Sequence, residues 1–275
     1  MHIREYSLPV GWYPRETGEI AGFITGIASN EQKKTRAVIA PHAGWYYSGR
    51  IAALGITSLQ PNADTVVVLG GHLPSGHSPL FAMEDAVRTP FGPMAIDENL
   101  RSVLLRQLGG CDDCYRDNTV EVLLPMVHFL FPNADLLWLR LPADIGSFES
   151  GKLISEAAAG LNKNVVVIGS ADLTHYGVNY GFSPHGRGKK ALSWVRDVND
   201  ANLIKAVESG DPCEVLRCAR QDSSTCSAGA VLGAMGFAAA EGLKNARLLK
   251  YGTSADIERL DIPDSFVGYA AFAFY

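Results

Sequence analysis

The sequence predicts an α/β protein in which a sheet of buried strands is covered by helices on both faces. Two patterns indicate this class. Short apolar segments, rich in β-branched residues or leucine, are separated by segments of helical length. The apolar segments do not alternate with polar residues, which is typical of parallel strands covered on both faces. The composition of the 275 residues, 47% hydrophobic and 19% charged, is that of a folded globular protein. We expect a single domain over residues 1–275, because no repeat or low-complexity linker divides the chain.

Four segments are predicted to form the buried strands, and two more complete the sheet near the C-terminus. The four are RAVIAP (36–41), TVVVLGG (65–71), DLLWLRLP (135–142) and NVVVIGS (164–170). The two C-terminal ones are ARLLKYG (246–252) and SFVGYAAFAFY (265–275). The order of strands and helices along the chain predicts layers of helices on either side of the sheet.

The segments between the strands are predicted to be helical. They are 48–60, 97–108, 118–131, 147–161, 188–209, 212–219 and 227–242. The second begins with an acidic turn, as helices often do. The third contains Pro125, so we expect it to be kinked or broken. The Gly-rich stretch 177–190 is predicted to be a loop at the active site rather than a linker.

Charge and hydropathy exclude several classes of protein. The formal net charge of −5 argues against a dedicated nucleic-acid binder, which would show a basic face. No run of 18 apolar residues is present, so we expect no membrane-spanning helix. The N-terminus has early charges and no apolar stretch long enough for a signal peptide. We therefore expect a cytoplasmic protein whose five cysteines are reduced.

Three of the predicted strands end in the same way, with a polar side chain suited to chemistry. AVIAP is followed by His42, VVVLGG by His72, and VVVIGSA by Asp172, with His175 three residues later. In open α/β sheets, ligands bind beyond the carboxyl ends of the strands. A single histidine in such a place is more often a turn residue than a ligand. Because three strands share the pattern, we expect these four side chains to line one site.

Cys226 is the candidate for a further member of this site. It lies where the helix of 227–242 begins, and the serine and threonine before it are candidate N-caps. A thiol at a helix N-terminus has a lowered pKa, which favours the thiolate that binds metals. The alternative is that Cys226 is a small buried hydrophobic residue.

Two imidazoles and a thiolate suit Fe(II), Zn or Cu rather than Mg or Ca. Three protein ligands leave open positions, so Asp172 and His175 are candidate acid/base groups.

Other motifs are weaker. Cys111 and Cys114 form a single CxxC without a second pair, and we interpret them as structural. His77 follows His72 closely and remains an alternative ligand, whereas His185 lies in the Gly-rich loop and is predicted to be solvated. The dinucleotide fingerprint, the phosphate-binding loop and the nucleophile elbow are absent from the sequence.

The same residues resemble a known family, the MEMO family, also called AmmeMemoRadiSam system protein B. The similarity extends over nearly the whole chain. It is carried by REYSLPVGWYP, AVIAPHAGWYYSG, VVVLGGH, VRTPFGPMAID, NTVEVLLP, SADLTHYG, SSTCSAGAVLG and VGYAAFA. The resemblance implies a fold similar to class III extradiol ring-cleavage dioxygenases. That LigB-like fold is a three-layer α/β/α sandwich around a mostly parallel, mixed sheet.

The resemblance also implies roles for residues. It places a metal, iron or copper, on His42, His72 and Cys226, with Asp172 and His175 in the same cleft. We expect Glu121 to be a partly buried carboxylate that orients loops near the cleft by accepting hydrogen bonds. Tyr47, Ser48 and Asn118 are expected to line the cleft or to support its ligands.

The sequence departs from the family pattern in four places. The usual LGPSH is LGGH here and one residue shorter, which keeps His77 as the alternative to His72. The E-H-S-x-E-V motif contains Asn118 in place of the family's histidine. The family's early histidine is Leu8, and the residues after Cys226 are serine and alanine instead of glycine and a basic residue. A cleft with fewer imidazoles is expected to bind metal less tightly or to take a different ligand.

Three functions compete at this stage. The first is a metal-dependent oxidoreductase, dioxygenase-like, with Fe(II) favoured over Cu or Zn. The second is a non-enzymatic module whose cleft binds a peptide or small molecule. The third is hydrolysis by a zinc-bound water. In each, the partner is a small molecule or a peptide rather than nucleic acid or a membrane, and the sequence predicts no oligomeric state.

Overall fold

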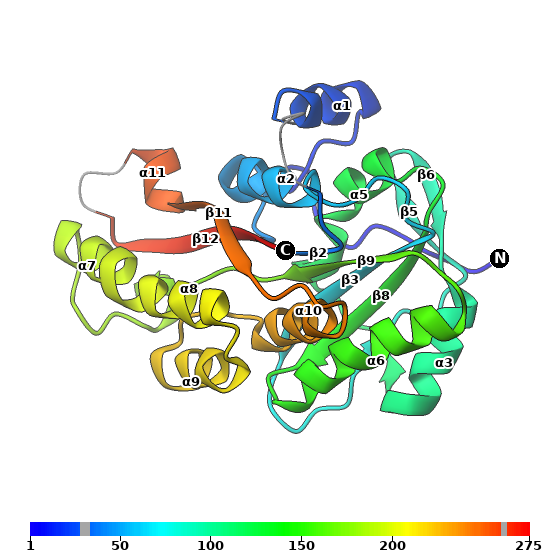
Figure 1. The fold of residues 1–275 in the computed structure, drawn as a ribbon. Helices are drawn as coiled ribbons and strands as arrows, with labels where there is room; N and C mark the ends of the chain where they lie inside the picture. The colour runs from blue at the N-terminus through cyan, green and yellow to red at the C-terminus, as the bar shows by residue number, and fades with distance from the viewer. Residues whose placement is uncertain (28–33, 260–262) are drawn as a thin grey trace.

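The centre of the computed structural model, which describes residues 1–27, 34–259 and 263–275, is a mixed sheet (Figure 1). In the described part of the chain this sheet has nine strands, in the order β10-β12-β2-β9-β3-β8-β4-β7, with β11 also paired to β12. The strands are β2 (Ala37–Ala40), β3 (Thr65–Leu73), β4 (Leu80–Phe81), β7 (Cys111–Asp112), β8 (Asp135–Pro142), β9 (Val165–Ser170), β10 (His175–Gly177), β11 (Ala246–Thr253) and β12 (Ser265–Phe274).

The four predicted buried strands are confirmed, and they are neighbours. The strand pairs β2–β9, β9–β3 and β3–β8 are all parallel. β12, β11, β10 and β4 add antiparallel pairs, so the sheet is mixed with a parallel centre. Because the central strands run in one direction, their carboxyl ends lie at one edge of the sheet.

Helices cover both faces of the sheet (Figure 1). Along β3, Val66 and Val68 belong to one buried cluster, while Val67 and Leu69 belong to the other. Successive side chains of a strand point to opposite faces, so residues 66–69, which are covered on both faces, are all apolar. The first face carries α1 (Thr17–Thr25), α2 (Arg50–Ile56) and α5 (Leu124–Leu130). The second carries α3 (Glu98–Leu108), α6 (Gly146–Gly160) and α10 (Ala228–Ala240).

Two predicted helices are interrupted. The predicted break in 118–131 is confirmed, since it forms α4 (Asn118–Glu121) and α5, with Pro125 in the first turn of α5. There a proline removes no helical hydrogen bond. The predicted helix 188–209 contains a π-helical turn between α7 (Lys189–Trp194) and α8 (Asp200–Ser209). Another π-helical turn, Trp45–Gly49, precedes α2. In the described part of the chain no helix combines the length and the apolar character that crossing a membrane would need.

Several short elements were not predicted. They are β1 (Ile3–Arg4), β5 (Ala86–Thr89) and β6 (Gly92–Ala95), which form a small second sheet, and also β4, β7, β10, α1 and α11 (Ser254–Glu258). The strands and α11 are too short to show a hydrophobic period in the sequence. The helix predicted at 212–219 is longer, α9 (Pro212–Asp222).

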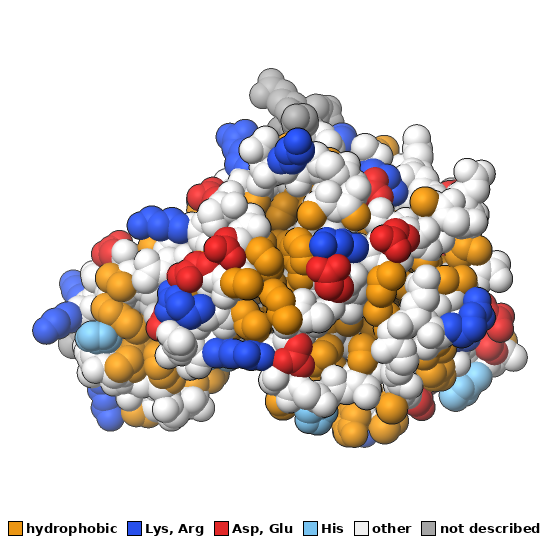
Figure 2. All heavy atoms as spheres, turned by 60° about the horizontal axis from the view of Figure 1, so that its bottom comes forward, with side chains coloured by type: hydrophobic (Ala, Val, Ile, Leu, Met, Phe, Trp, Pro, Cys, Tyr) orange, Lys and Arg blue, Asp and Glu red, His pale blue; other side chains and the backbone are white. Residues whose placement is uncertain are grey.

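On the side of the molecule at the bottom of Figure 1, Lys and Arg side chains are interspersed with Asp and Glu side chains rather than gathered in one patch (Figure 2).

Candidate metal centre

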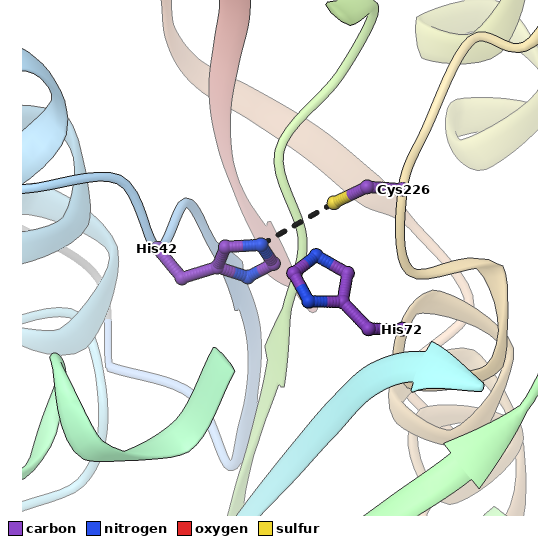
Figure 3. Close-up of side chains that lie close together, drawn as sticks. All are labelled: His42, His72 and Cys226. Atoms are coloured by element: carbon purple, nitrogen blue, oxygen red, sulfur yellow. Dashed lines mark hydrogen bonds between the residues drawn. The ribbon is translucent and has the colours of Figure 1, made fainter. Parts of the chain in front are cut away.

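Three side chains from distant parts of the chain converge at the carboxyl edge of the sheet. His42 follows β2, His72 lies near the end of β3, and Cys226 precedes α10. One ligand atom from each lies within 4.8 Å of the others. The Cys226 sulfur is 3.3 Å from Nε2 of His42, and the two imidazole rings are 5.1 Å apart and nearly perpendicular. Figure 3 shows the three side chains pointing toward one another.

Close packing between β3 and α10 brings two of these residues together. A Cβ on Gly71 would overlap the side chain of Ser227. Gly71 precedes His72, and Ser227 follows Cys226. The missing side chain therefore lets the end of β3 approach the start of α10, so that the imidazole and the thiol meet.

The loop that carries His42 is held from both sides. The backbone N–H of His42 donates to Oδ1 of Asp172 at 2.8 Å, and the carbonyl of His42 accepts from Nδ2 of Asn118 at 3.0 Å. Its Nδ1 lies 2.9 Å from Oγ of Ser170, whose hydroxyl donates to the carbonyl of Thr119. Because that hydroxyl has one proton, it must accept from Nδ1 of His42. The neutral imidazole then presents the lone pair of Nε2 to the thiol.

A carboxylate orients the imidazole of His72 through the same ring nitrogen, Nδ1. Its Nδ1 is 2.9 Å from Oδ2 of Asp117, which can only accept. Asp117 is in turn 3.3 Å from the guanidinium of Arg140 and accepts from the backbone N–H of Thr119. The backbone of His72 has φ 56°, an uncommon conformation for a residue with a side chain. Such conformations are concentrated at functional sites.

The charges of the cluster reinforce one another. Burial raises the pKa of the Cys226 thiol, but the nearby imidazoles of His42, His175 and His72 outweigh it, so this pKa lies well below its usual value. Burial lowers the pKa of His72, but Asp117 and Cys226 outweigh it and raise this pKa to about 10. A negative charge on Cys226 and positive charges on the imidazoles therefore favour each other.

Asp172 and His175 lie beside the three candidate ligands, as the sequence predicted for their place in the cleft. Asp172 is buried, and its Oδ2 is 3.9 Å from Nε2 of His42 and 3.8 Å from Nε2 of His175. Burial lowers the pKa of His175, but Asp172 and Cys226 raise it to about 10. Nε2 of His175 is buried and has no hydrogen-bond partner. A buried imidazole nitrogen without a hydrogen-bond partner, close to Asp172 and Cys226, fits a site that holds a further group such as a metal ion.

The cluster opens into a hollow of about 720 Å³. Among the predicted cleft residues, Tyr47 and Asn118 line this hollow, together with His42, His72, Asp172 and His175. Aromatic side chains form much of the remaining wall, namely Trp12, Tyr46, Tyr180 and Tyr269. Ser48 is buried instead and donates to the carbonyl of Ala43 at 3.0 Å, so it supports the loop after His42 rather than facing the hollow.

Glu121 holds the N-terminal segment against the cleft. The carboxylate is buried and accepts from the backbone N–H groups of Ser7 (2.8 Å) and Leu8 (3.1 Å) and from the hydroxyl of Tyr13 (2.9 Å). The segment that these bonds anchor contributes Trp12 to the wall of the hollow. The predicted hydrogen-bond-accepting carboxylate is present, and it is buried rather than partly buried.

The structure separates the remaining candidates from the cluster. His77 is exposed and is not in the group formed by His42, His72 and Cys226. Cys111 and Cys114 are exposed free thiols. The predicted N-caps before Cys226 are wrong, because the N-cap of α10 is Ser227, whose side chain makes no capping hydrogen bond.

The residues that orient the imidazoles are not predicted from the sequence. Ser170 lies within a predicted strand, and Asp117 and Arg140 do not follow the strand endings. A signal for Ser170 was present, since it is the polar residue that ends the apolar run VVVIGS. The buried pairing of Asp117 with Arg140 had no local signal, because the two lie on different elements.

Comparison with known proteins identifies a family. Residues 4–273 match the family described as Memo-like protein. A MEMO1 family protein of Methanococcoides burtonii is 30% identical, over 98% of this chain and 98% of its own length. A MEMO1 family protein of Methanopyrus kandleri is also 30% identical, over 86% of this chain and 82% of its own. A third, from Pyrobaculum arsenaticum, is 26% identical over the full length of both chains (100%).

Proposed function

The chain belongs to the Memo-like protein family, and from this premise we propose that it is a metal-dependent oxidoreductase. The metal would be held by His42, His72 and Cys226, with Fe(II) favoured and Cu or Zn as alternatives. The ligand that reacts would enter the hollow beside these residues.

The observation that carries the proposal is the convergence of two imidazoles and a thiol within 4.8 Å at the end of an open hollow. Nitrogen and sulfur donors favour borderline divalent metals over Mg or Ca. A structural zinc site usually has four protein ligands, whereas three leave positions for oxygen or a substrate. The imidazole orientations set by Ser170 and Asp117 support the proposal, because metal-binding histidines commonly use their other nitrogen in this way.

The other side chains have roles that their own chemistry suggests. A bound Fe(II) would supply the capacity to activate oxygen. His175, beside Asp172, would move a proton between its Nε2 and a ligand in the hollow. Trp12 and Tyr180 would contact an apolar part of the ligand. We also propose that the layered fold is that of class III extradiol dioxygenases, with a thiolate where those enzymes use a carboxylate.

Metal loading under anaerobic conditions tests the proposal. The purified protein is stripped of metal, loaded with Fe(II), and exposed to oxygen while oxygen consumption is followed. We expect stoichiometric iron binding and oxygen consumption above that of free Fe(II), with both lost in His42→Ala and retained in His77→Ala.

Iron binding without oxygen consumption would contradict an oxidoreductase. Hydrolysis of 4-nitrophenyl acetate by the zinc-loaded protein, and not by the iron-loaded or metal-free protein, would indicate a hydrolase instead. Peptide or small-molecule binding that persists in the presence of a chelator, with no turnover, would indicate a binding module.

A further inference from the structure

Two neighbouring tyrosines form an aromatic corner on the wall of the hollow. The rings of Tyr46 and Tyr47 have centroids 5.0 Å apart and lie at 85° to each other. Both line the hollow that contains His42, His72 and His175. Tyr46 is 69% exposed, so its ring is accessible to a ligand.

A carboxylate lies beside this corner. Oε1 of Glu258, at the end of α11, accepts a hydrogen bond from the hydroxyl of Tyr47 at 2.9 Å. Glu258 also lines the hollow. Apart from Asp172 and the imidazoles, the other described side chains that line the hollow are uncharged, and none is a lysine or arginine. The wall is therefore aromatic and acidic at this point, without a basic group to bind an anion.

Each imidazole of the cluster lies near a carboxylate. His42 and His175 face the carboxylate of Asp172, and His72 is paired with Asp117. The carboxylates near the imidazoles are therefore already engaged, whereas the aromatic corner and Glu258 remain to interact with a ligand.

We propose that the hollow takes an organic ammonium ion, held against the faces of Tyr46 and Tyr47 with Glu258 as its counter-ion. The face of an aromatic ring attracts cations, and the exposed Tyr46 ring lies beside Tyr47, whose hydroxyl contacts the Glu258 carboxylate. The rest of the ligand would extend toward the metal centre. That part of the inference rests on the proposed function, whereas the ammonium contact does not require a metal.

A set of matched probes tests the inference on the full-length, metal-free protein. Choline carries a trimethylammonium group, 3,3-dimethyl-1-butanol has the same shape without the charge, and 3,3-dimethylbutyrate has the opposite charge. We expect calorimetric titration to show choline binding about tenfold more tightly than the alcohol, as cation–π attraction with a carboxylate implies. The butyrate should not bind measurably. Equal binding of choline and the alcohol, tighter binding of the butyrate, or no binding of choline would overturn the inference.

Two variants locate the contact. Tyr46→Ala and Glu258→Gln should each weaken choline binding about fivefold or more, with little effect on the alcohol, because both side chains are exposed and leave the core intact. Glu149→Gln, an exposed carboxylate on α6, is the matched control and should bind choline as the wild type does. Unchanged choline affinity in both Tyr46→Ala and Glu258→Gln would overturn the inference. Fe(II) affinity of the same variants should be unchanged, so a failure of the metal proposal is recognised separately.

Discussion

Ser170 and Asp117 determine which nitrogen of each imidazole faces the thiol. Ser170 accepts from His42 because its own proton is given to a carbonyl, and Asp117 accepts from His72 because a carboxylate has no proton to give. When the rings are neutral, as metal-binding imidazoles are, the free lone pair is therefore on Nε2. The imidazole orientations are therefore set by residues outside the group of candidate ligands.

Cys226→Ser should bind Fe(II), Zn or Cu at least 10–100-fold more weakly than the wild type, since even the residues that support a ligand contribute that much. The hydroxyl keeps the size but is a poor donor for a borderline metal. Calorimetric titration under reducing, anaerobic conditions measures the effect. Cys111→Ser and Cys114→Ser change exposed thiols and should bind metal normally. Equal affinity of Cys226→Ser and wild type would mean that Cys226 is only a packing residue.

Asp117→Asn should weaken metal binding by roughly 10–100-fold, because the amide no longer holds the His72 proton with a full charge. It also removes the partner that Asp117 provides for the buried guanidinium of Arg140. Asp112→Asn alters a nearby exposed carboxylate and serves as the control. Metal titration and thermal unfolding are both needed. A variant that loses stability but keeps wild-type metal affinity would refute the orienting role of Asp117.

At the level of secondary-structure elements, the site depends on the junction of β3 with α10 and on the N-terminal segment. The junction places His72 beside Cys226, and the segment of residues 7–13 closes one wall of the hollow. Neither contact is local in sequence. Each can be disturbed without touching a candidate ligand.

Gly71→Ala should destabilise the fold by about 1–3 kcal/mol, as overpacking does, because the new methyl group overlaps Ser227. It should also weaken metal binding by separating the end of β3 from the start of α10. In Gly160→Ala, the new methyl group meets no other atom within 4 Å, so stability and metal binding should be retained. Denaturant unfolding and metal titration of both variants provide the comparison. Wild-type metal affinity in Gly71→Ala would show that the junction does not control the site.

Glu121→Gln should lower the free energy of unfolding by about 1–3 kcal/mol, because its amide would place a donor among the N–H and O–H groups that now donate to the carboxylate. The loosened segment should also weaken metal binding. Glu156→Gln, an exposed change on α6, is the control. If Glu121→Gln leaves both stability and metal affinity unchanged, the loop-orienting role is refuted.

At the scale of the whole molecule, Asp200 couples the packing of α8 on the sheet to pH. It is fully buried and accepts from the backbone N–H of Thr174 at 3.1 Å and from the hydroxyl of Tyr251 at 2.7 Å. Burial raises its pKa from 3.8 to about 6, although hydrogen bonds to these neighbours lower it in part. The folded protein therefore holds this proton more tightly than the unfolded chain does.

The contribution of Asp200 to stability should be fully present below about pH 4 and be lost as the pH rises through about 6. The loss should reach about 3 kcal/mol, since each pKa unit corresponds to roughly 1.4 kcal/mol. Denaturant unfolding from pH 4 to 7 should show this decline in the wild type and in the exposed control Asp197→Asn, and lack it in Asp200→Asn. Parallel pH profiles for Asp200→Asn and wild type would contradict the assignment.

The sequence predicted most of the layered fold and the composition of the site. The buried strands and the break at Pro125 follow from local patterns, and the strand endings identified His42, His72 and Asp172. The short elements β1, β5 and β6 escaped prediction because they carry too few residues for a period. The N-cap of α10 was misplaced because serines and a threonine on either side of Cys226 offer equivalent local signals.

By itself, the sequence determined which segments are buried strands, because apolar runs bounded by turns are a local property of the chain. It also determined which residue types stand at the strand ends. Only the tertiary structure decided that Cys226 meets His42 across 184 positions, and that Asp117 supports His72 across 45. The physical reason is that a buried polar group needs a partner, and the path of the chain through the sheet decides which partner comes within reach.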